Sequence, residues 1–146
     1  MSPFLQTALE AAQTAQEIIL HYYQGKFDIE LKADQSPVTI ADVEAEKAIK
    51  KIILERFPEH GFFGEETGKT NPDAEYTWLI DPIDGTKSFV RRYPMFSTQI
   101  ALMKGSELIL GVSNAPAFGE MAYAEKGQGA FLNQQSIKVS GYTELN

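Results

Sequence analysis

The stretch of sequence with the clearest chemical potential is an acidic turn that follows an apolar run. Asp81 and Asp84 are three residues apart, and Pro82 lies between them. Because proline restricts φ, the turn is stiff, and it can bring both carboxylates and the carbonyl of Ile83 to one side of the chain. Three converging oxygen atoms are typical ligands of a hard cation such as Mg²⁺. The spacing therefore indicates a candidate cation site.

The residues after this turn suit an anion. Gly85 allows the backbone to come close to a ligand, and a short helix is expected to begin at this step. Backbone N–H groups at the start of that helix, together with the Thr86 hydroxyl, could hold a phosphate. The alternative is an ordinary turn, because Asp, Pro and Gly dominate turns for backbone reasons alone.

A second acidic group lies upstream, where Glu65 and Glu66 follow an apolar pair of phenylalanines. Adjacent glutamates most often form a solvated surface. If they met Asp81 and Asp84 in space, however, the four carboxylates would repel one another, and a divalent cation would relieve that repulsion. Both interpretations remain open at this point.

Asp42 also has two possible roles. It lies three residues after Thr39 and can complete a capping box at the start of a helix. It could instead accept a hydrogen bond or bind a ligand at the mouth of the acidic site. Lys32 precedes it in a polar stretch, residues 32–37, for which a surface loop is the ordinary expectation.

Charge and composition narrow the function further. The 146 residues carry 20 Asp and Glu against 13 Lys and Arg, a net charge of −7, and seven of those carboxylates fall between Glu59 and Asp84. Such a chain repels nucleic acid and anionic lipid, so we expect neither as a partner. The absence of a long apolar run and of a signal-like N-terminus favours a cytoplasmic protein. With no cysteine, a thiol nucleophile or Cys-ligated metal is excluded.

Two helices are expected ahead of the acidic region. Ser2 can cap the first, whose apolar residues recur at helical spacing until Gly25. Thr39 can cap the second, which should continue to Phe57 and stop at Pro58.

Short apolar segments with strand character follow these helices. The expected strands are residues 76–80, 97–103, 107–113, 121–124 and 137–139, while residues 27–31 alternate only weakly. Helices followed by closely spaced strands predict an α+β domain over residues 1–146, with the two helices covering one face of a mainly antiparallel sheet.

Other motifs carry less weight. Residues 68–70 end like a Walker A loop, but the glycine that the motif needs five positions earlier is Phe63. Residues 127–129 lack the third glycine of a dinucleotide fingerprint and suit a turn. His21 and His60 have no metal-ligand spacing and are expected to be structural or exposed.

Four blocks of the sequence, in the same order, resemble the inositol monophosphatase-like family of metal-dependent, lithium-sensitive phosphatases, which includes a type of histidinol-phosphatase. The blocks are residues 37–42, 64–66, 78–86 and 126–133. The resemblance implies the N-terminal portion of a layered α/β sandwich. Residues 87–94 are more similar to the histidinol-phosphatase-like branch.

The resemblance also implies roles for individual residues. The implied metal ligands are Glu65, Asp81, Ile83 through its carbonyl, Asp84 and Asp42. The implied catalytic residues are Thr86, Asp42 and Glu65. The implied substrate-binding residues are Gly85, Thr86 and Lys32. Two or three Mg²⁺ ions would be the cofactors, and Mn²⁺ could replace them.

The implied activity is hydrolysis of a small polyol or sugar phosphate, such as inositol monophosphate or histidinol phosphate, by metal-activated water in a homodimer. Members of the family are longer, and their second half supplies a further metal-binding aspartate and much of the substrate pocket. The alternative is therefore a truncated, noncatalytic metal-binding or interaction module.

Overall fold

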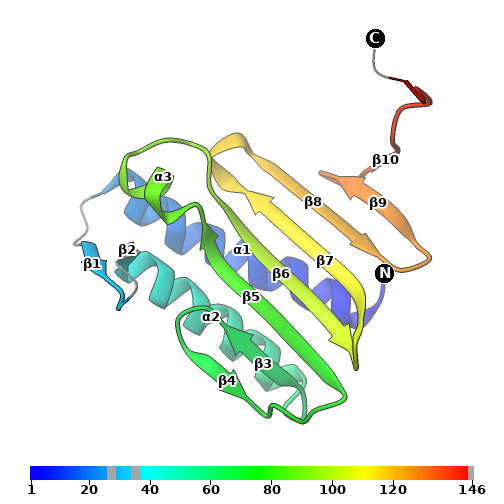
Figure 1. Cartoon of the computed structure of the whole chain (residues 1–146), viewed down its shortest axis with the longest axis horizontal. Helices are drawn as coiled ribbons and strands as arrows, with labels where there is room; N and C mark the ends of the chain where they lie inside the picture. The colour runs from blue at the N-terminus through cyan, green and yellow to red at the C-terminus, as the bar shows by residue number, and fades with distance from the viewer. Residues whose placement is uncertain (26–28, 34–36, 145–146) are drawn as a thin grey trace.

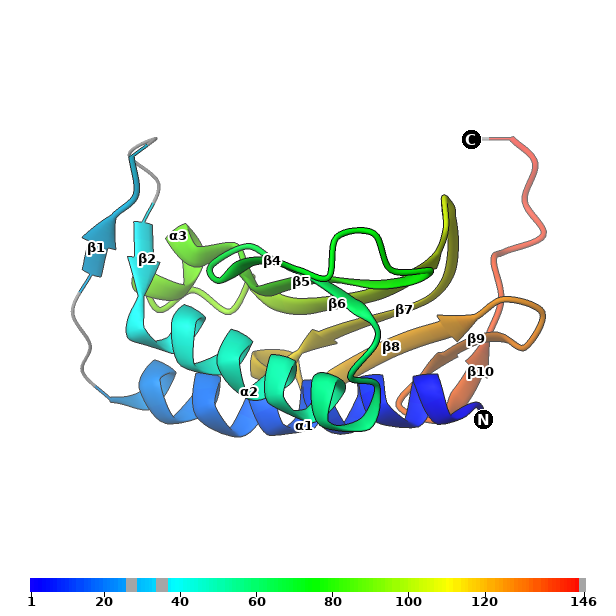
Figure 2. The same ribbon diagram turned by 90° about the horizontal axis from the view of Figure 1, so that it is seen from below.

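The computed structural model describes residues 1–25, 29–33 and 37–144. Two long helices, α1 (Pro3–Gln24) and α2 (Ile40–Arg56), lie side by side on one face of a large sheet (Figures 1 and 2). A small antiparallel pair, β1 (Ile29–Leu31) and β2 (Pro37–Thr39), lies beside the N-terminal end of α2. The predicted α+β arrangement is confirmed.

The large sheet has eight strands in the order β10-β9-β8-β7-β6-β5-β3-β4. Its strands are β3 (Gly61–Gly64), β4 (Gly68–Thr70), β5 (Tyr76–Asp84), β6 (Ser97–Lys104), β7 (Glu107–Ala115), β8 (Glu120–Glu125), β9 (Gly129–Leu132) and β10 (Gln135–Ile137). Strands β3 and β5 pair in parallel, whereas the remaining neighbours pair antiparallel. Two short helices, α3 (Thr86–Val90) and η1 (Pro116–Phe118), connect strands.

The helix ends follow the predicted capping residues. The Ser2 hydroxyl accepts a hydrogen bond from the Leu5 N–H at 3.1 Å, and Thr39 forms a complete capping box with Asp42. Helices α1 and α2 pack closely because small side chains are buried on both. These side chains are Ala8, Ala11, Ala12, Ala15, Ala41 and Ala45.

The core lies between these helices and the sheet. Trp78 and Ile80 of β5 point into it, as does Leu102 of β6. Because side chains alternate along a strand, Leu79 and Asp81 face the opposite side of the sheet, which the helices leave uncovered (Figure 2). Within the described ranges, no helix has the length and apolarity needed to cross a bilayer.

The sheet differs from the predicted one in several places. Strands β3, β4 and β9 were not expected, because each has only three or four residues and contains glycine. The strand expected at residues 137–139 lies instead at residues 135–137. Residues 26–28 and 34–36 lie outside the described residues, so the weak alternation over residues 27–31 and the loop at 32–37 are seen only in part.

Candidate functional site

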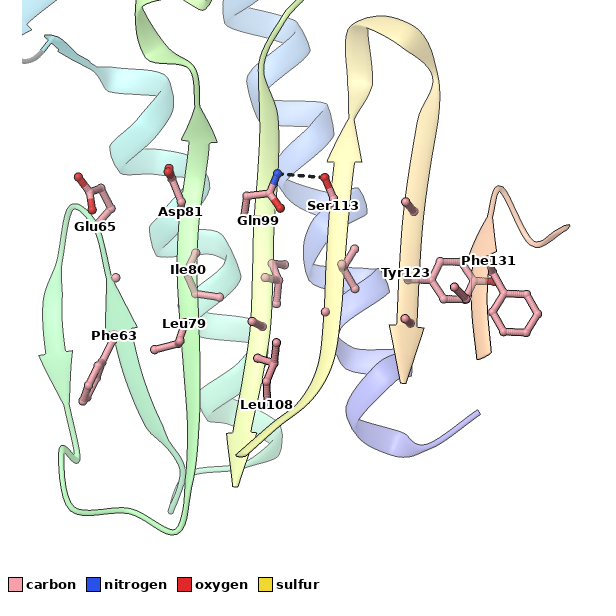
Figure 3. Close-up of a pocket in the computed structure, with 18 of the residues that line it drawn as sticks. Phe63, Glu65, Leu79, Ile80, Asp81, Gln99, Leu108, Ser113, Tyr123 and Phe131 are labelled. Atoms are coloured by element: carbon pink, nitrogen blue, oxygen red, sulfur yellow. Dashed lines mark hydrogen bonds between the residues drawn. The ribbon is translucent and has the colours of Figure 1, made fainter. Parts of the chain in front are cut away.

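Strand direction brings the two acidic groups together. In the parallel pair, Gly64 of β3 lies opposite Ile80 of β5, so Glu65 and Asp81 follow at the same end of the sheet. The Glu65 N–H extends this pairing by donating to the Ile80 carbonyl at 3.1 Å. Figure 3 shows Glu65 and Asp81 at the same end of neighbouring strands.

The acidic turn continues strand β5 rather than ending it at Asp81. The pairing with β6 shifts between Asp81, opposite Gln99, and Asp84, opposite Ser97. Such an irregularity bends the strand and re-aims its side chains. Gly85 then adopts a φ of 92°, and a Cβ there would lie 2.7 Å from the Met95 carbonyl oxygen, so only glycine fits at this step.

These segments enclose a cavity of about 270 Å³. It is lined by Lys32, Glu65, Glu66, Asp81, Ile83, Asp84, Gly85, Thr86 and Lys87. Every residue predicted for the site, apart from Asp42, therefore contributes to one cavity.

Asp81 has the most strongly perturbed ionisation in this cavity. Burial, followed by the nearby carboxylates of Asp84, Glu65 and Asp42, raises the pKa of Asp81 to about 6. Each of these causes disfavours the charged form. A cation bound here would remove the repulsion and favour ionised Asp81.

The acidic pair at residues 65 and 66 is not a uniformly solvated surface. The Glu65 side chain is 57% exposed, whereas that of Glu66 is only 7% exposed. Lys32 bonds both, at 3.3 Å to Glu65 and 2.7 Å to Glu66. Burial raises the pKa of Glu66 although the Lys32 ammonium opposes this, and burial lowers the pKa of Lys32 less than the two glutamates raise it.

Asp42 completes the predicted capping box and also bonds a residue of the cavity wall. Its Oδ2 accepts hydrogen bonds from the Thr39 N–H at 2.8 Å and the Thr39 hydroxyl at 2.7 Å. Its Oδ1 accepts one from the Thr86 hydroxyl at 3.1 Å. Asp42 is 1% exposed and thus lies behind Thr86, from which it supports the cavity wall.

The oxygen atoms available in the cavity are of the kind that binds a hard cation. The candidate ligands are carboxylate oxygens and the Ile83 carbonyl, as Mg²⁺ prefers. Over the part of the chain that the structure describes, no three acidic or histidine side chains are already gathered as a metal-holding group. Glu65 bonds Lys32 instead, and its exposed side chain would have to turn toward Asp81.

One residue of this region, Glu46, was missed by sequence reasoning. It is fully buried on α2, one helical turn after Asp42, and its carboxylate accepts hydrogen bonds from the Glu66 and Thr67 N–H groups. A detectable signal was present, because Glu46 is a carboxylate in the apolar stripe that contains Ala45 and Ile49.

A second, larger hollow of about 800 Å³ crosses the sheet face opposite the helices (Figure 3). We call it the sheet groove, and its lining includes Phe63, Leu79, Leu108, Tyr123, Phe131 and Ile137. Its polar end begins at Glu65 and Asp81 and continues to Gln99, whose amide donates to the Ser113 hydroxyl at 3.0 Å. The groove therefore opens beside the acidic cavity.

Comparison with known proteins identifies the family. The model of the inositol monophosphatase family matches residues 1–146. The chain belongs to this family. A histidinol-phosphatase from Chlorobaculum parvum is 42% identical over 146 residues, which are 99% of this chain and 56% of that protein. An inositol monophosphatase from Mesembryanthemum crystallinum is 38% identical over 149 residues, covering 99% of this chain and 55% of that protein.

The structure of the extragenic suppressor protein suhB from Bartonella henselae has the same fold. It superimposes with a TM-score of 0.91 and 30% identity over 97% of this chain and 56% of that one. The resemblance stated from four sequence blocks is confirmed, and the fold corresponds to the N-terminal portion of an inositol monophosphatase. The chain spans little more than half the length of these relatives.

Proposed function

We propose that this chain forms the metal- and phosphate-binding part of a Mg²⁺-dependent phosphomonoesterase. The observation that carries the proposal is that Glu65, Asp81 and Asp84 line one cavity, where burial and the neighbouring carboxylates raise the pKa of Asp81. Perturbed carboxylates in a cleft are typical of functional sites. Membership of the inositol monophosphatase family supports the same reaction class.

Glu65, Asp81, Asp84 and the Ile83 carbonyl would hold the first cations, and Asp42 would shape a further position through Thr86. Two or three Mg²⁺ ions are proposed, and Mn²⁺ suits the same oxygen ligands. Bound Mg²⁺ lowers the pKa of a coordinated water and neutralises charge on a phosphoryl group.

Thr86 and Asp42 would orient the attacking water. The Thr86 hydroxyl has two acceptors within reach of its single proton, Asp42 Oδ1 at 3.1 Å and the Ile83 carbonyl at 3.0 Å. When it donates to either, its lone pairs remain for a water in the cavity. It can accept a proton from water while passing its own proton to Asp42. Glu65 would hold the same water from the opposite wall.

The substrate phosphate would lie against the backbone N–H groups of Gly85 and Thr86. Lys32 and Lys87 also line the cavity and add positive charge to it. A phosphate that draws Lys32 toward itself would release Glu65 from its ion pair with that lysine. Glu65 would then be available as a metal ligand.

Histidinol phosphate is the preferred substrate in this proposal. The 42% identical relative is named a histidinol-phosphatase, and residues 87–94 favour the same branch. Inositol monophosphate and other small polyol phosphates are the competing substrates, because the 38% identical relative is named an inositol monophosphatase.

Phosphate release tests this proposal. The assay would compare the chain alone with a chimera that continues it with the second half of the Chlorobaculum parvum histidinol-phosphatase, with and without Mg²⁺. We expect Mg²⁺-dependent, lithium-inhibited release by the chimera, faster with histidinol phosphate than with inositol monophosphate. Asp84→Asn should abolish release. A folded chimera that is inactive with both esters would contradict the proposal.

The second candidate is a noncatalytic metal-binding or interaction module that forms a homodimer. The uncovered sheet groove of about 800 Å³ favours it, because exposed apolar surfaces of this kind mark interaction sites. Mg²⁺ binding without turnover, by the chain and by the chimera alike, would support this candidate over the enzyme.

A further inference from the structure

A buried carboxylate of helix α2 bonds the backbone of the turn that carries Glu65. Glu46 of α2 is fully buried, and its Oε1 accepts a hydrogen bond from the Glu66 N–H at 2.9 Å. Its Oε2 accepts a second bond from the Thr67 N–H. A buried charge is costly unless it is hydrogen bonded, and bonds to an ionised acceptor are stronger than neutral ones. Both oxygens of Glu46 are therefore committed to the backbone of this turn.

Gly64 makes this arrangement possible. A Cβ at Gly64 would lie 2.5 Å from the Glu46 carboxylate carbon, so any larger residue would displace that carboxylate. The Glu65 N–H, in turn, donates to the Ile80 carbonyl. Three consecutive N–H groups, at Glu65, Glu66 and Thr67, are thus fixed by β5 and α2.

The same helix also holds the other half of the cavity. Asp42 lies one turn before Glu46, and residues four apart on a helix project from the same face. Asp42 bonds Thr86 after the acidic turn, whereas Glu46 bonds the turn at residues 64–67. Helix α2 therefore fixes the spacing between the segment with Asp81 and Asp84 and the segment with Glu65.

We propose that Glu46 is a positioning residue for the metal site, an inference that rests on the proposed function. Glu46 is not among the residues that line the cavity, and its oxygens are already occupied, so it does not act as a ligand. It acts by keeping the backbone of Glu65 at a fixed distance from Asp81. Loss of such outer partners commonly weakens metal binding by about 10–100-fold.

Calorimetric titration with Mg²⁺, using the whole chain, tests this role. Glu46→Gln keeps the size but places an NH₂ group against a backbone N–H, while Glu46→Asp keeps the charge but shortens the side chain. We expect both to raise the Kd for Mg²⁺ by about 10–100-fold. Glu44→Gln is the matched control, because it removes the same charge from an exposed position on the same helix, and it should leave the Kd within about twofold.

The outcomes separate the possible explanations. Full affinity in Glu46→Gln would overturn the positioning role while leaving the proposed function intact, and full affinity in Glu46→Asp alone would show an effect of charge instead. No Mg²⁺ binding by the wild-type chain would overturn the proposed function and this inference with it. If the Glu46 variants do not fold, Gly64→Ala displaces the same contact from the opposite side. It should weaken Mg²⁺ binding equally, and full affinity there would overturn the role.

Amide hydrogen exchange provides a readout that needs no metal. The bonds to Glu46 predict slow exchange at the Glu66 and Thr67 N–H groups of the wild-type chain, and faster exchange at one or both in Glu46→Gln. Unchanged exchange in that variant would show that Glu46 does not fix the turn.

Discussion

The Thr86 hydroxyl lies 3.1 Å from Oδ1 of Asp42, although 44 residues separate them in the chain. Asp42 also caps α2 through its other oxygen. A residue of the capping box of α2 thus also supports the wall of the cavity. The two alternatives raised by the sequence, cap and site residue, are not exclusive.

Thr86→Val should separate these two roles. It removes the hydroxyl but leaves the capping bonds of Asp42 with Thr39 in place, so a buried carboxylate oxygen loses its partner. We expect the free energy of unfolding, measured in urea, to fall by about 1–3 kcal/mol. Thr86→Ser retains the hydroxyl and should lose much less. Equal losses in the two variants would contradict the importance of this bond.

Compared with wild type, Asp81→Asn should be more stable without metal and should gain no stability from Mg²⁺. The pKa of Asp81 is raised from 3.8 to about 6 in the folded chain, so its contribution to stability is full below pH 3.8 and lost as the pH rises through 6. The metal-free variant should therefore melt at a higher temperature than wild type at pH 7.5, and the gap should close near pH 3.5.

Millimolar Mg²⁺ should then raise the Tm of the wild-type chain but not that of Asp81→Asn. Asp73→Asn, at an exposed position away from the cavity, is the control and should respond as wild type. An equal Mg²⁺-induced rise in wild type and Asp81→Asn would argue against Asp81 as a ligand.

His60 should make stability fall in mild acid. Burial lowers the pKa of His60 below 6.5, and its Nδ1 accepts a hydrogen bond from the Trp78 indole N–H at 3.0 Å, which requires an unprotonated nitrogen. The unfolded chain takes up the proton first, so this contribution is full above pH 6.5 and is lost as the pH falls below it. Urea titrations at pH 7.5 and 5.5 would measure the change in the free energy of unfolding, which we expect to be smaller for His60→Gln than for wild type. His21→Gln changes an exposed histidine and is the control, for which we expect the same change as for wild type.

Gly85→Ala should destabilise the chain and distort the acidic turn. The φ of 92° is strained for alanine, and the new Cβ would meet the Met95 carbonyl oxygen at 2.7 Å. We expect a loss of more than about 1–3 kcal/mol in the free energy of unfolding. Gly105→Ala is the control, because its φ of 58° is also positive but nothing lies within 4 Å of the added Cβ. A similar loss at both glycines would mean that the close approach to Met95 adds nothing.

The uncovered sheet groove predicts self-association of the chain. Leu108 and Ile137 line it and remain 58% and 44% exposed. The double variant Leu108→Lys and Ile137→Lys should sediment as a smaller species than wild type, because charge opposes burial of this face. Val139→Lys changes an even more exposed residue outside the groove lining and should leave the sedimentation coefficient unchanged.

Local signals predicted the helices and the acidic turn well, because caps, prolines and apolar spacing act over a few residues. Ser2 and Thr39 cap the helices as expected. Strand β3 was missed, because its four residues include two glycines and it depends on pairing with β5 farther along the chain.

The site, like the fold, was predictable where it depends on neighbouring residues and not where it depends on tertiary pairing. The grouping of Asp81, Asp84 and Thr86 follows from one local motif, whereas the arrival of Glu65 follows only from tertiary pairing. The four blocks that resemble the family include residues 64–66, and this resemblance implies the same grouping. Glu46 was missed because a glutamate on a helix is usually solvated, although its place in the apolar stripe of α2 was a signal in the sequence; the structure shows it buried against Gly64.

The parallel alignment of β3 with β5 also determines which changes in chain length the site can tolerate. Insertions or deletions in residues 71–75, between β4 and β5, leave the pairing of Gly64 with Ile80 intact, so we expect them to be neutral toward cation binding. A single-residue deletion within β3 would instead place its side chains on the opposite face of the sheet and move Glu65 away from Asp81 and Asp84. Length variation among natural homologues should therefore be concentrated after β4 and absent from β3.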